Sequence, residues 1–277
     1  MGRLHAQKIK ASDEAVLLAV VDPNPDTSLD LPWVADHPAE VDFAVIACPS
    51  AAHVREAKRY LERGIPCLVE KPVATSVKEG DLLRGYRQLS INHLERYNPA
   101  VRACGAGEEL GYFKSTRLGV LSKRSRDVDV VLDLMVHDLD LLLRWTKSPV
   151  REVRSVGVSL MGDGLDVVEA WIETESGCVA SLTASRVSQK KERSIRVVDQ
   201  QNYWSLDLLT HQARRTGWSE GGPLGVEVVP VKKEDAITAL HKSFFTAVRG
   251  EGEFPVPVEE ALAAVALAER VRSAVVS

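Results

Sequence analysis

The feature that most constrains the fold is a strand, helix and strand in succession between residues 41 and 69. Val41–Cys48 and Ile65–Val69 are apolar runs typical of strands that are buried on both faces. Between them, Ser50 can cap a helix through Val54–Leu61 that ends at Gly64. A βαβ unit of this kind predicts parallel strands joined by a right-handed crossover, and therefore an α/β domain.

The second of these strands ends in two charged residues, Glu70 and Lys71, and Pro72 keeps it from continuing. In an open parallel sheet, ligands bind in the crevice at the carboxyl ends of the strands. The residue before a proline is restricted to extended backbone, so we expect Lys71 to face this crevice and to hydrogen-bond a reacting oxygen. The alternative interpretation is an ordinary surface ion pair.

An earlier apolar run, Ala15–Val21, predicts another buried strand, and it ends at Asp22, 20 residues after Gly2. The same spacing separates the last glycine of a dinucleotide-binding motif from the acid that binds the ribose 2′-hydroxyl. An acid there favours NAD and makes NADP less suitable, because the carboxylate repels a 2′-phosphate. The spacing alone is a weak signal, since any glycine and any strand-end aspartate would satisfy it.

Composition excludes several classes of protein. The chain has 277 residues, a formal net charge of -4 and an isoelectric point near 6.0, with no clustering of positive residues. Binding to nucleic acid is therefore not expected. No apolar run is long enough for a membrane span and no signal peptide is visible, so we expect a cytoplasmic protein. The four cysteines show no metal-ligand spacing, and we expect no metal site.

The stretch Val128–Trp145 predicts a helix that is apolar on most sides and therefore buried. Four of its polar residues, Asp133, His137, Asp140 and Arg144, form one narrow stripe. An aspartate one turn before a histidine can orient the imidazole and raise its basicity, as a proton acceptor requires. The alternative is that the stripe is simply the solvent face.

From Val150 onward the apolar pattern has a period of two, which predicts one large, open, mainly antiparallel sheet in an α+β domain. The expected strands are Phe113–Leu121, Val153–Leu160, Asp166–Thr174, Cys178–Ser185, Arg193–Val198 and Asn202–Leu208. A loop is expected at Gly217–Gly225, followed by helices at Ala236–Arg249 and Val258–Val275. The free face of such a sheet is a usual oligomer surface, so we expect a homo-dimer or homo-tetramer. Trp171, Tyr203 and Trp204 could lie on that face or in the core.

Three motifs, in this order and spacing, resemble the glucose-fructose oxidoreductase and inositol dehydrogenase family (Gfo/Idh/MocA). They are Ile46–His53, Glu70–Pro72 and the helix that carries Asp133 and His137. The resemblance implies a Rossmann-type parallel sheet domain at residues 1–92 and an α+β substrate and oligomerisation domain at 93–255. It also implies that a last helix, within 256–277, packs back toward the first domain.

The resemblance also implies roles for particular residues. His137 would be the base, Asp133 its orienting partner and Lys71 the donor to the alkoxide, although the base could equally be Lys71. Cofactor-side positions would be Gly2, Asp22, Cys48, Pro49, His53, Glu70, Lys71 and Asn92. Substrate-side positions would be Lys71, Arg96, Tyr97, Asp133 and His137, and His93 could line the same pocket or be structural.

Within that family, Asn92–Val101 and Gly177–Arg186 are most similar to the UDP-N-acetylglucosamine 3-dehydrogenase branch. This similarity implies NAD-dependent oxidation of the 3-hydroxyl of the nucleotide sugar. One alternative is a dehydrogenase of another sugar or polyol, which would differ around Asn98 and Ser122–Arg126. The other is a non-catalytic binding or scaffold relative.

The sequence departs from the family at its beginning. The family starts with a strand and G-x-G-x-x-G, whereas this sequence begins where the last glycine would be, at Gly2. The prolines between Asp22 and Val41 leave little room for a crossover helix, and no glycine separates Gln88 from Leu89. We therefore expect that segments of a complete protein are missing at these three places, with a degenerate cofactor domain as the alternative.

Overall fold

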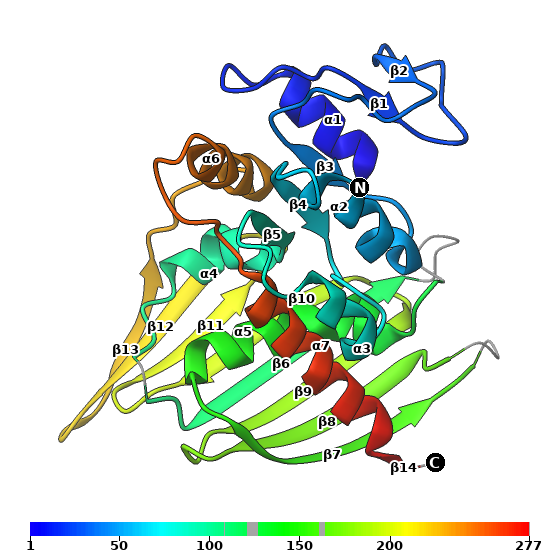
Figure 1. Cartoon of the computed structure of the whole chain (residues 1–277). Helices are drawn as coiled ribbons and strands as arrows, with labels where there is room; N and C mark the ends of the chain where they lie inside the picture. The colour runs from blue at the N-terminus through cyan, green and yellow to red at the C-terminus, as the bar shows by residue number, and fades with distance from the viewer. Residues whose placement is uncertain (108, 121–126, 161–163, 277) are drawn as a thin grey trace.

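A computed structural model describes residues 1–107, 109–120, 127–160 and 164–276. Figure 1 shows a small sheet with its helices above one very large sheet, and a long C-terminal helix that crosses the face of the large sheet. The helices are α1 (Gly2–Lys10), α2 (His53–Leu61), α3 (Val77–Gly80), α4 (Pro99–Ala103), α5 (Val136–Thr146), α6 (Ala236–Val248) and α7 (Val258–Ser273). The α/β architecture, with one small parallel sheet and one large sheet, is the one expected from the sequence, and a separate two-stranded sheet is added to it.

The small sheet contains the βαβ unit that the sequence predicts. Its strands β3 (Ala44–Ile46), β4 (Cys67–Glu70) and β5 (Leu89–Asn92) are parallel and adjacent in that order. All residues of β4 and β5 are buried, which explains the apolar run Cys67–Val69 in β4, while Ser90 and Asn92 of β5 are buried polar residues. The register aligns Glu70 with Asn92, so the polar ends of β4 and β5 meet at the carboxyl edge of the sheet.

A second, separate pair of strands precedes this sheet. Strand β1 (Val20–Val21) pairs in parallel with β2 (Trp33–Val34), and neither pairs with β3. The predicted long strand Ala15–Val21 is therefore wrong in extent, because only its last two residues find a hydrogen-bonding neighbour. Val16 is 86 % exposed, as an apolar residue without a partner strand would be. Among the described residues no strand pairs with β3 on the side opposite β4.

The large sheet has nine strands in the order β13-β12-β11-β10-β6-β9-β8-β7-β14. Their bounds are β6 (Tyr112–Val120), β7 (Val150–Val158), β8 (Val167–Thr174), β9 (Val179–Ser188), β10 (Glu192–Val198), β11 (Asn202–Asp207), β12 (Gln212–Ser219), β13 (Gly222–Val229) and β14 (Val275–Val276). Most neighbours are antiparallel, but β6 lies between β10 and β9 and runs parallel to β9. The expected simple meander is corrected accordingly.

Helices α5 and α7 cover one face of this sheet, and the other face is open (Figure 1). The alternation along β8 places Ile172 in the core and Trp171, 42 % exposed, on the open face. Tyr203 is also on the exposed side, whereas Trp204 is only 4 % exposed and packs in the core. Trp171 and Tyr203 therefore lie on the open face, and Trp204 lies in the core.

Two local predictions are wrong. The expected loop Gly217–Gly225 is instead the hairpin of β12 and β13, which turns at Glu220 and Gly221, and Gly222 begins β13 with a φ of 109°. The sequence of Ser76–Arg87 also predicts a helix, but the structure forms only the short α3 followed by a 3-10 turn, Asp81–Leu83. Gly80 lies so close to α7 that an added Cβ would be 2.2 Å from Leu262 Cδ2, which fixes α3 against that helix.

The C-terminal segment joins the two sheets. Ile91 N donates to Val256 O at 3.1 Å, and Val256 N donates to Ser90 Oγ at 3.2 Å. Farther along, Glu269 on α7 accepts a hydrogen bond from Val77 N at 2.9 Å. These contacts hold β5 and α3 against α7, and so they fix the small sheet above the helices of the large one.

Candidate active site

Lys71 meets Asp133 at the junction between the two sheets. Lys71 Nζ lies 2.6 Å from Asp133 O and 3.1 Å from Asp133 Oδ1. Their side chains are 17 % and 15 % exposed, so the pair is sheltered but still reachable from solvent. The ammonium group is therefore held at the end of β4 by a residue of the other sheet's helical layer, where it can donate to a third oxygen.

The helix that carries Asp133 is not regular. Val131–Met135 forms a π-helical turn, which passes directly into α5 at Val136. Asp129 caps the start, because its Oδ1 accepts from Val131 N and Leu132 N. π-helical turns inside helices frequently occur at functional sites. Here the turn carries Asp133 and is followed at once by His137.

His137 lies one turn beyond Asp133, but the expected hydrogen bond between them is not formed. The Asp133 carboxylate pairs with Lys71, and His137 Nδ1 is buried with no hydrogen-bond partner among the described residues. Burial, and next the positive charge of Lys71, lowers the pKa of His137 well below its usual value. The imidazole is therefore neutral at pH 7, the form that can accept a proton.

A buried group of charges lies beneath this site and was not predicted. Arg117 on β6 is 1 % exposed and binds Asp138 with two nitrogens, at 3.0 and 2.7 Å. Its third nitrogen donates to Glu95 at 2.7 Å, and Arg193 lies 3.5 Å from the same carboxylate. The alternation of β6 could have revealed it, because Arg117 occupies an inward-facing position and a buried cation needs partners.

The two predicted substrate-side residues that follow β5, Arg96 and Tyr97, have different surroundings. Arg96 binds both carboxylate oxygens of Asp140, at 2.7 and 2.5 Å, and also Glu260, with its side chain 5 % exposed. Tyr97 is half-buried and packs against the Phe244 cluster. His93 is buried, with Nδ1 3.5 Å from Asp140 Oδ2. Arg96 therefore braces α5 and α7. Of the four residues of the predicted polar stripe only Arg144 is exposed, so the stripe is not a continuous solvent face.

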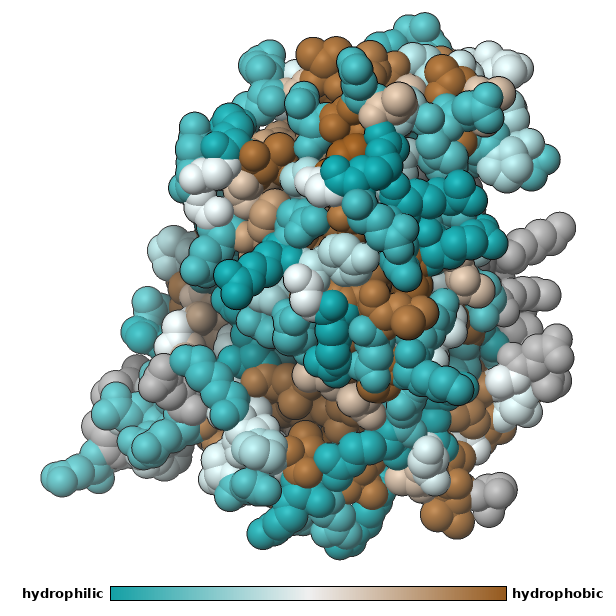
Figure 2. All heavy atoms as spheres, in the orientation of Figure 1, coloured by the Kyte–Doolittle hydropathy of each residue, from teal (hydrophilic) through white to brown (hydrophobic). Residues whose placement is uncertain are grey.

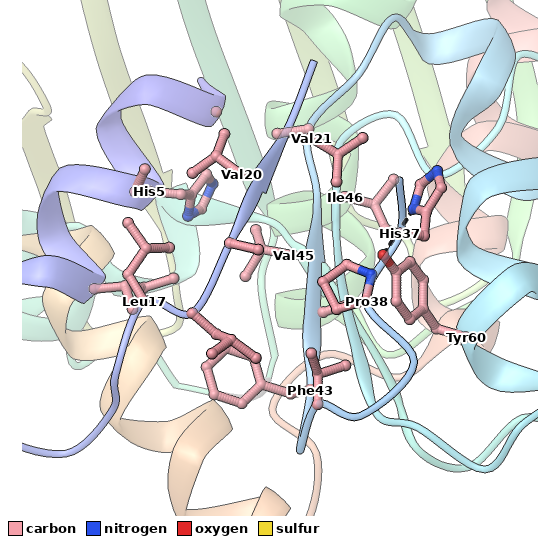
Figure 3. Close-up of a pocket in the computed structure, with 18 of the residues that line it drawn as sticks. His5, Leu17, Val20, Val21, His37, Pro38, Phe43, Val45, Ile46 and Tyr60 are labelled. Carbon is pink, nitrogen blue, oxygen red and sulfur yellow. Dashed lines mark hydrogen bonds between the residues drawn. The ribbon is translucent and has the colours of Figure 1, made fainter. Parts of the chain in front are cut away.

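The predicted cofactor-side residues divide into two sets. Gly2, Asp22, Cys48 and Pro49 line one hollow of about 2520 Å³ between β1 and β3. Figure 3 shows Val20 and Val21 on one side of this hollow and Val45 and Ile46 on the other. Glu70 and Asn92 are instead buried beneath it and hydrogen-bonded to each other at 2.7 Å.

His53 joins two loops of the predicted cofactor side. Its Nε2 lies 2.9 Å from Cys48 O and its Nδ1 lies 2.8 Å from Pro72 O. These contacts tie the loop after β3 to the loop after Lys71. Ser50, next to Pro49, donates its backbone N–H to Asp127 at 3.0 Å. The predicted substrate-loop residues Ser122–Arg126 lie outside the described residues.

Three features of the hollow match what a dinucleotide requires. The N-terminus of α1 has no side-chain cap, so its free N–H groups can bind a phosphate. Asp22 stands at the end of β1, where a carboxylate can accept hydrogen bonds from a ribose diol. Gly2 opens α1 only 3.6 Å from Ala47 Cβ, measured from an added Cβ, so the helix packs close to the loop after β3.

Comparisons with known proteins agree with this geometry. Residues 1–84 match the oxidoreductase family model with an NAD-binding Rossmann fold, and residues 117–201 match the GFO/IDH/MocA C-terminal domain. The UDP-N-acetylglucosamine 3-dehydrogenase of Acidithiobacillus ferrooxidans is 36 % identical over 270 residues, which cover 90 % of this chain and 85 % of the relative. The chain belongs to the Gfo/Idh/MocA oxidoreductase family.

Solved structures superimpose closely on the chain. The Acidithiobacillus ferrooxidans enzyme has a TM-score of 0.90 at 33 % identity, and the match covers 99 % of this chain and 93 % of that structure. Levoglucosan dehydrogenase in complex with NADH has a TM-score of 0.84 at 15 % identity, with 99 % and 94 % covered, and supports the fold alone. Among the described residues, no helix is long and apolar enough to cross a membrane, and no cluster could hold a metal ion.

Proposed function

We propose that this protein oxidises the 3-hydroxyl of UDP-N-acetylglucosamine to the ketone with NAD as the oxidant. The observation that carries the proposal is the meeting of Lys71 with Asp133 beside the neutral His137. The similarity to a UDP-N-acetylglucosamine 3-dehydrogenase over 90 % of the chain supports the substrate. A bound nicotinamide would supply the acceptor for the hydride that leaves the sugar carbon.

The residues of the site would divide the proton chemistry between them. The lowered pKa of His137 keeps its imidazole unprotonated before the reaction, and its buried Nδ1, which has no partner among the described residues, can take part in accepting the hydroxyl proton as the carbonyl forms. The Lys71 ammonium, held by Asp133, would donate a hydrogen bond to the sugar oxygen while negative charge develops there. The proton thus moves from the sugar oxygen to the imidazole, and the two electrons leave with the hydride.

The open face of the nine-stranded sheet supports a proposal about assembly. Trp171 and Tyr203 are 42 % and 41 % exposed there, and Val156 and Val158 on β7 are each more than half exposed. Exposed aromatic and branched apolar side chains on one broad surface mark an interaction site. We propose that a second copy of the chain covers this face in a homo-oligomer.

The test of function is direct. The purified protein is mixed with NAD and UDP-N-acetylglucosamine, and the formation of reduced nicotinamide is followed by absorbance. Parallel reactions contain UDP-glucose, free N-acetylglucosamine and myo-inositol. Turnover confined to UDP-N-acetylglucosamine supports the proposal. Turnover only with another sugar or polyol would assign a different substrate in the same family, and binding of NAD without any turnover would favour the non-catalytic relative.

A further inference from the structure

Four buried polar side chains form a continuous line of hydrogen bonds behind the proposed site. His241 Nε2 on α6 lies 2.8 Å from His5 Nδ1 on α1, and His5 Nε2 lies 2.8 Å from Glu70 Oε1 at the end of β4. Asn92 on β5 donates to the same Glu70 oxygen at 2.7 Å. The four residues are between 1 % and 5 % exposed, so water does not compete for these bonds.

The chemistry of Glu70 fixes the direction of the bonds. Burial raises the pKa of Glu70, but the hydrogen bond and charge of His5 outweigh it and leave that pKa below its usual value. Glu70 is therefore an ionised acceptor, and His5 Nε2 must be the donor. Burial, and next the proximity of His5, lowers the pKa of His241 to about 4, so His241 is a neutral partner at pH 7.

The line of bonds continues to Lys71. Glu70 Oε2, the oxygen that does not contact His5, accepts a hydrogen bond from the backbone N–H of Lys71 at 3.2 Å. The same lysine carries the ammonium group that contacts Asp133. If the Glu70 carboxylate rotated, the peptide at Lys71 would lose this bond and the base of the lysine side chain would be free to shift.

We propose that His5 is a positioning residue for the dehydrogenase reaction, which fixes Lys71 through Glu70 and is itself fixed by His241. The inference rests on the proposed function in so far as Lys71 contacts the substrate. It gives α1 a second role, because the helix whose first residue, Gly2, lines the cofactor hollow also orients the carboxylate next to the catalytic lysine. Residues 5, 70 and 241 lie far apart in the chain, and only the fold brings them together.

A purely structural role would not require buried polar side chains at these four positions. Histidine, glutamate and asparagine are costly to bury, and apolar side chains of similar size would fill the same space between α1, α6 and β4. Phe244 and Phe245 already pack apolar surface on α6 one turn from His241. The polar line ends at the residue before Lys71, where exact placement of a carboxylate affects the geometry of the site.

The experiment compares variants of His5 in the full-length protein. His5→Leu removes the donor to Glu70, whereas His5→Gln keeps an N–H that can reach the same oxygen. Ser155→Ala is the control for loss of a buried bond between elements, because Ser155 Oγ donates to Val271 O at 2.6 Å far from Lys71. We expect His5→Leu to lower kcat roughly 10- to 100-fold with KM for the sugar nearly unchanged. His5→Gln should recover most of kcat, and Ser155→Ala should retain it.

A second readout does not depend on turnover. Hydrogen exchange at the Lys71 backbone amide, resolved by fragmentation mass spectrometry, should be faster in His5→Leu than in wild type and near wild type in the other two variants. Unchanged exchange and kcat in His5→Leu would overturn the inference, as would equal losses of kcat in the Leu and Gln variants with unchanged exchange. A wild-type protein that oxidises none of the sugars contradicts the proposed function instead, and the exchange rates then decide alone whether His5 fixes Lys71.

Discussion

The two sheets of this protein differ in how completely their strands are paired. The large sheet is continuous from β13 to β14, and its inner face is covered by α5 and α7. The small sheet stops at β3, and β1 and β2 stand apart across a hollow of about 2520 Å³. Leu18 near β1 is 59 % exposed, whereas Leu182 on β9 is fully buried. Figure 2 shows apolar atoms at the surface over the N-terminal domain, at the top of the view.

The difference in strand pairing places the proposed sugar chemistry and the proposed cofactor binding in different parts of the molecule. Lys71 directly follows β4, and its supporting network joins Glu70 on β4 and Asn92 on β5 to His5 on α1 and His241 on α6. Asp133 and His137 lie in the helical layer of the large sheet. The sugar chemistry therefore rests on well-packed elements. Asp22, which would contact the cofactor ribose, lies on the unpaired side of the hollow. Changes to the packed part should affect stability and catalysis strongly, and changes beside the hollow should affect cofactor choice.

The largest effect is expected in the large sheet. Arg117→Leu would leave Asp138 and Glu95 buried without their shared cation, and we expect a loss of about 3–5 kcal/mol in the free energy of unfolding. Arg214→Leu, on the exposed side of β12, is the matched control and should change stability by less than about 0.5 kcal/mol. Urea unfolding measures both. Similar losses in the two variants would show that the buried cluster does not stabilise this sheet.

The next effect concerns catalysis at the junction of the sheets. Lys71→Ala removes the donor to the developing alkoxide, so we expect kcat to fall roughly 10²- to 10³-fold while the unfolding midpoint stays close to wild type. Lys78→Ala, an exposed lysine at the start of α3, is the control and should keep full activity. Steady-state kinetics under saturating substrates measure the change. Equal turnover in wild type and Lys71→Ala would remove the lysine from the mechanism.

Local patterns predicted the parts of the site that depend on one element at a time. The apolar run before Glu70 and Lys71 correctly indicated a buried strand. Asp133, which the family resemblance implied as a site residue, contacts Lys71. The predicted partner of Asp133, His137, was wrong, because the carboxylate pairs with Lys71 instead. Local patterns do not indicate the π-helical turn or the approach of Lys71, since both depend on tertiary packing. His5 and His241 are 236 residues apart, and no periodicity connects them. Strand Ala15–Val21 was overextended because a strand forms only where a neighbour pairs with it.

The stability of the folded protein should also depend on acid, through His241 on α6, which contacts His5. In the unfolded chain His241 takes up a proton near pH 6.5, but in the folded protein it does so only near pH 4. The unfolded state therefore binds more protons between these values, and the free energy of unfolding falls as pH decreases from 6.5 to 4. His241 alone should account for a loss on the order of 3 kcal/mol.

The variant His241→Gln isolates this contribution, because glutamine does not titrate. Its free energy of unfolding should fall less steeply than that of wild type between pH 6.5 and 4, and the two should converge in slope above pH 7. His211→Asn, at an exposed turn with a φ of 56°, is the control and should follow the wild-type curve. Parallel curves for wild type and His241→Gln would show that His241 is not held neutral by the fold.

The smallest expected effect is on cofactor choice at the unpaired side of the hollow. Asp22 is exposed at the end of β1, and its Oδ1 accepts a hydrogen bond only from Asn24 N, at 2.8 Å, among the described residues. The remaining carboxylate oxygen is free to accept a bond from a ribose hydroxyl, but it would repel the 2′-phosphate of NADP. At partly desolvated range this repulsion is worth about 2–3 kcal/mol, or roughly a hundredfold in Kd.

We therefore expect NAD to bind about a hundredfold more tightly than NADP, as measured by quenching of tryptophan fluorescence. Asp22→Ser should narrow the ratio, because it removes the carboxylate that would repel the 2′-phosphate of NADP. Asp36→Ser, an exposed aspartate that does not line the hollow, should leave the ratio unchanged. Tighter binding of NADP by the wild type would refute the role of Asp22. Binding of neither nucleotide would indicate that the unpaired strands do not form a cofactor site, and the packed half of the molecule would then be a binding protein without its oxidant.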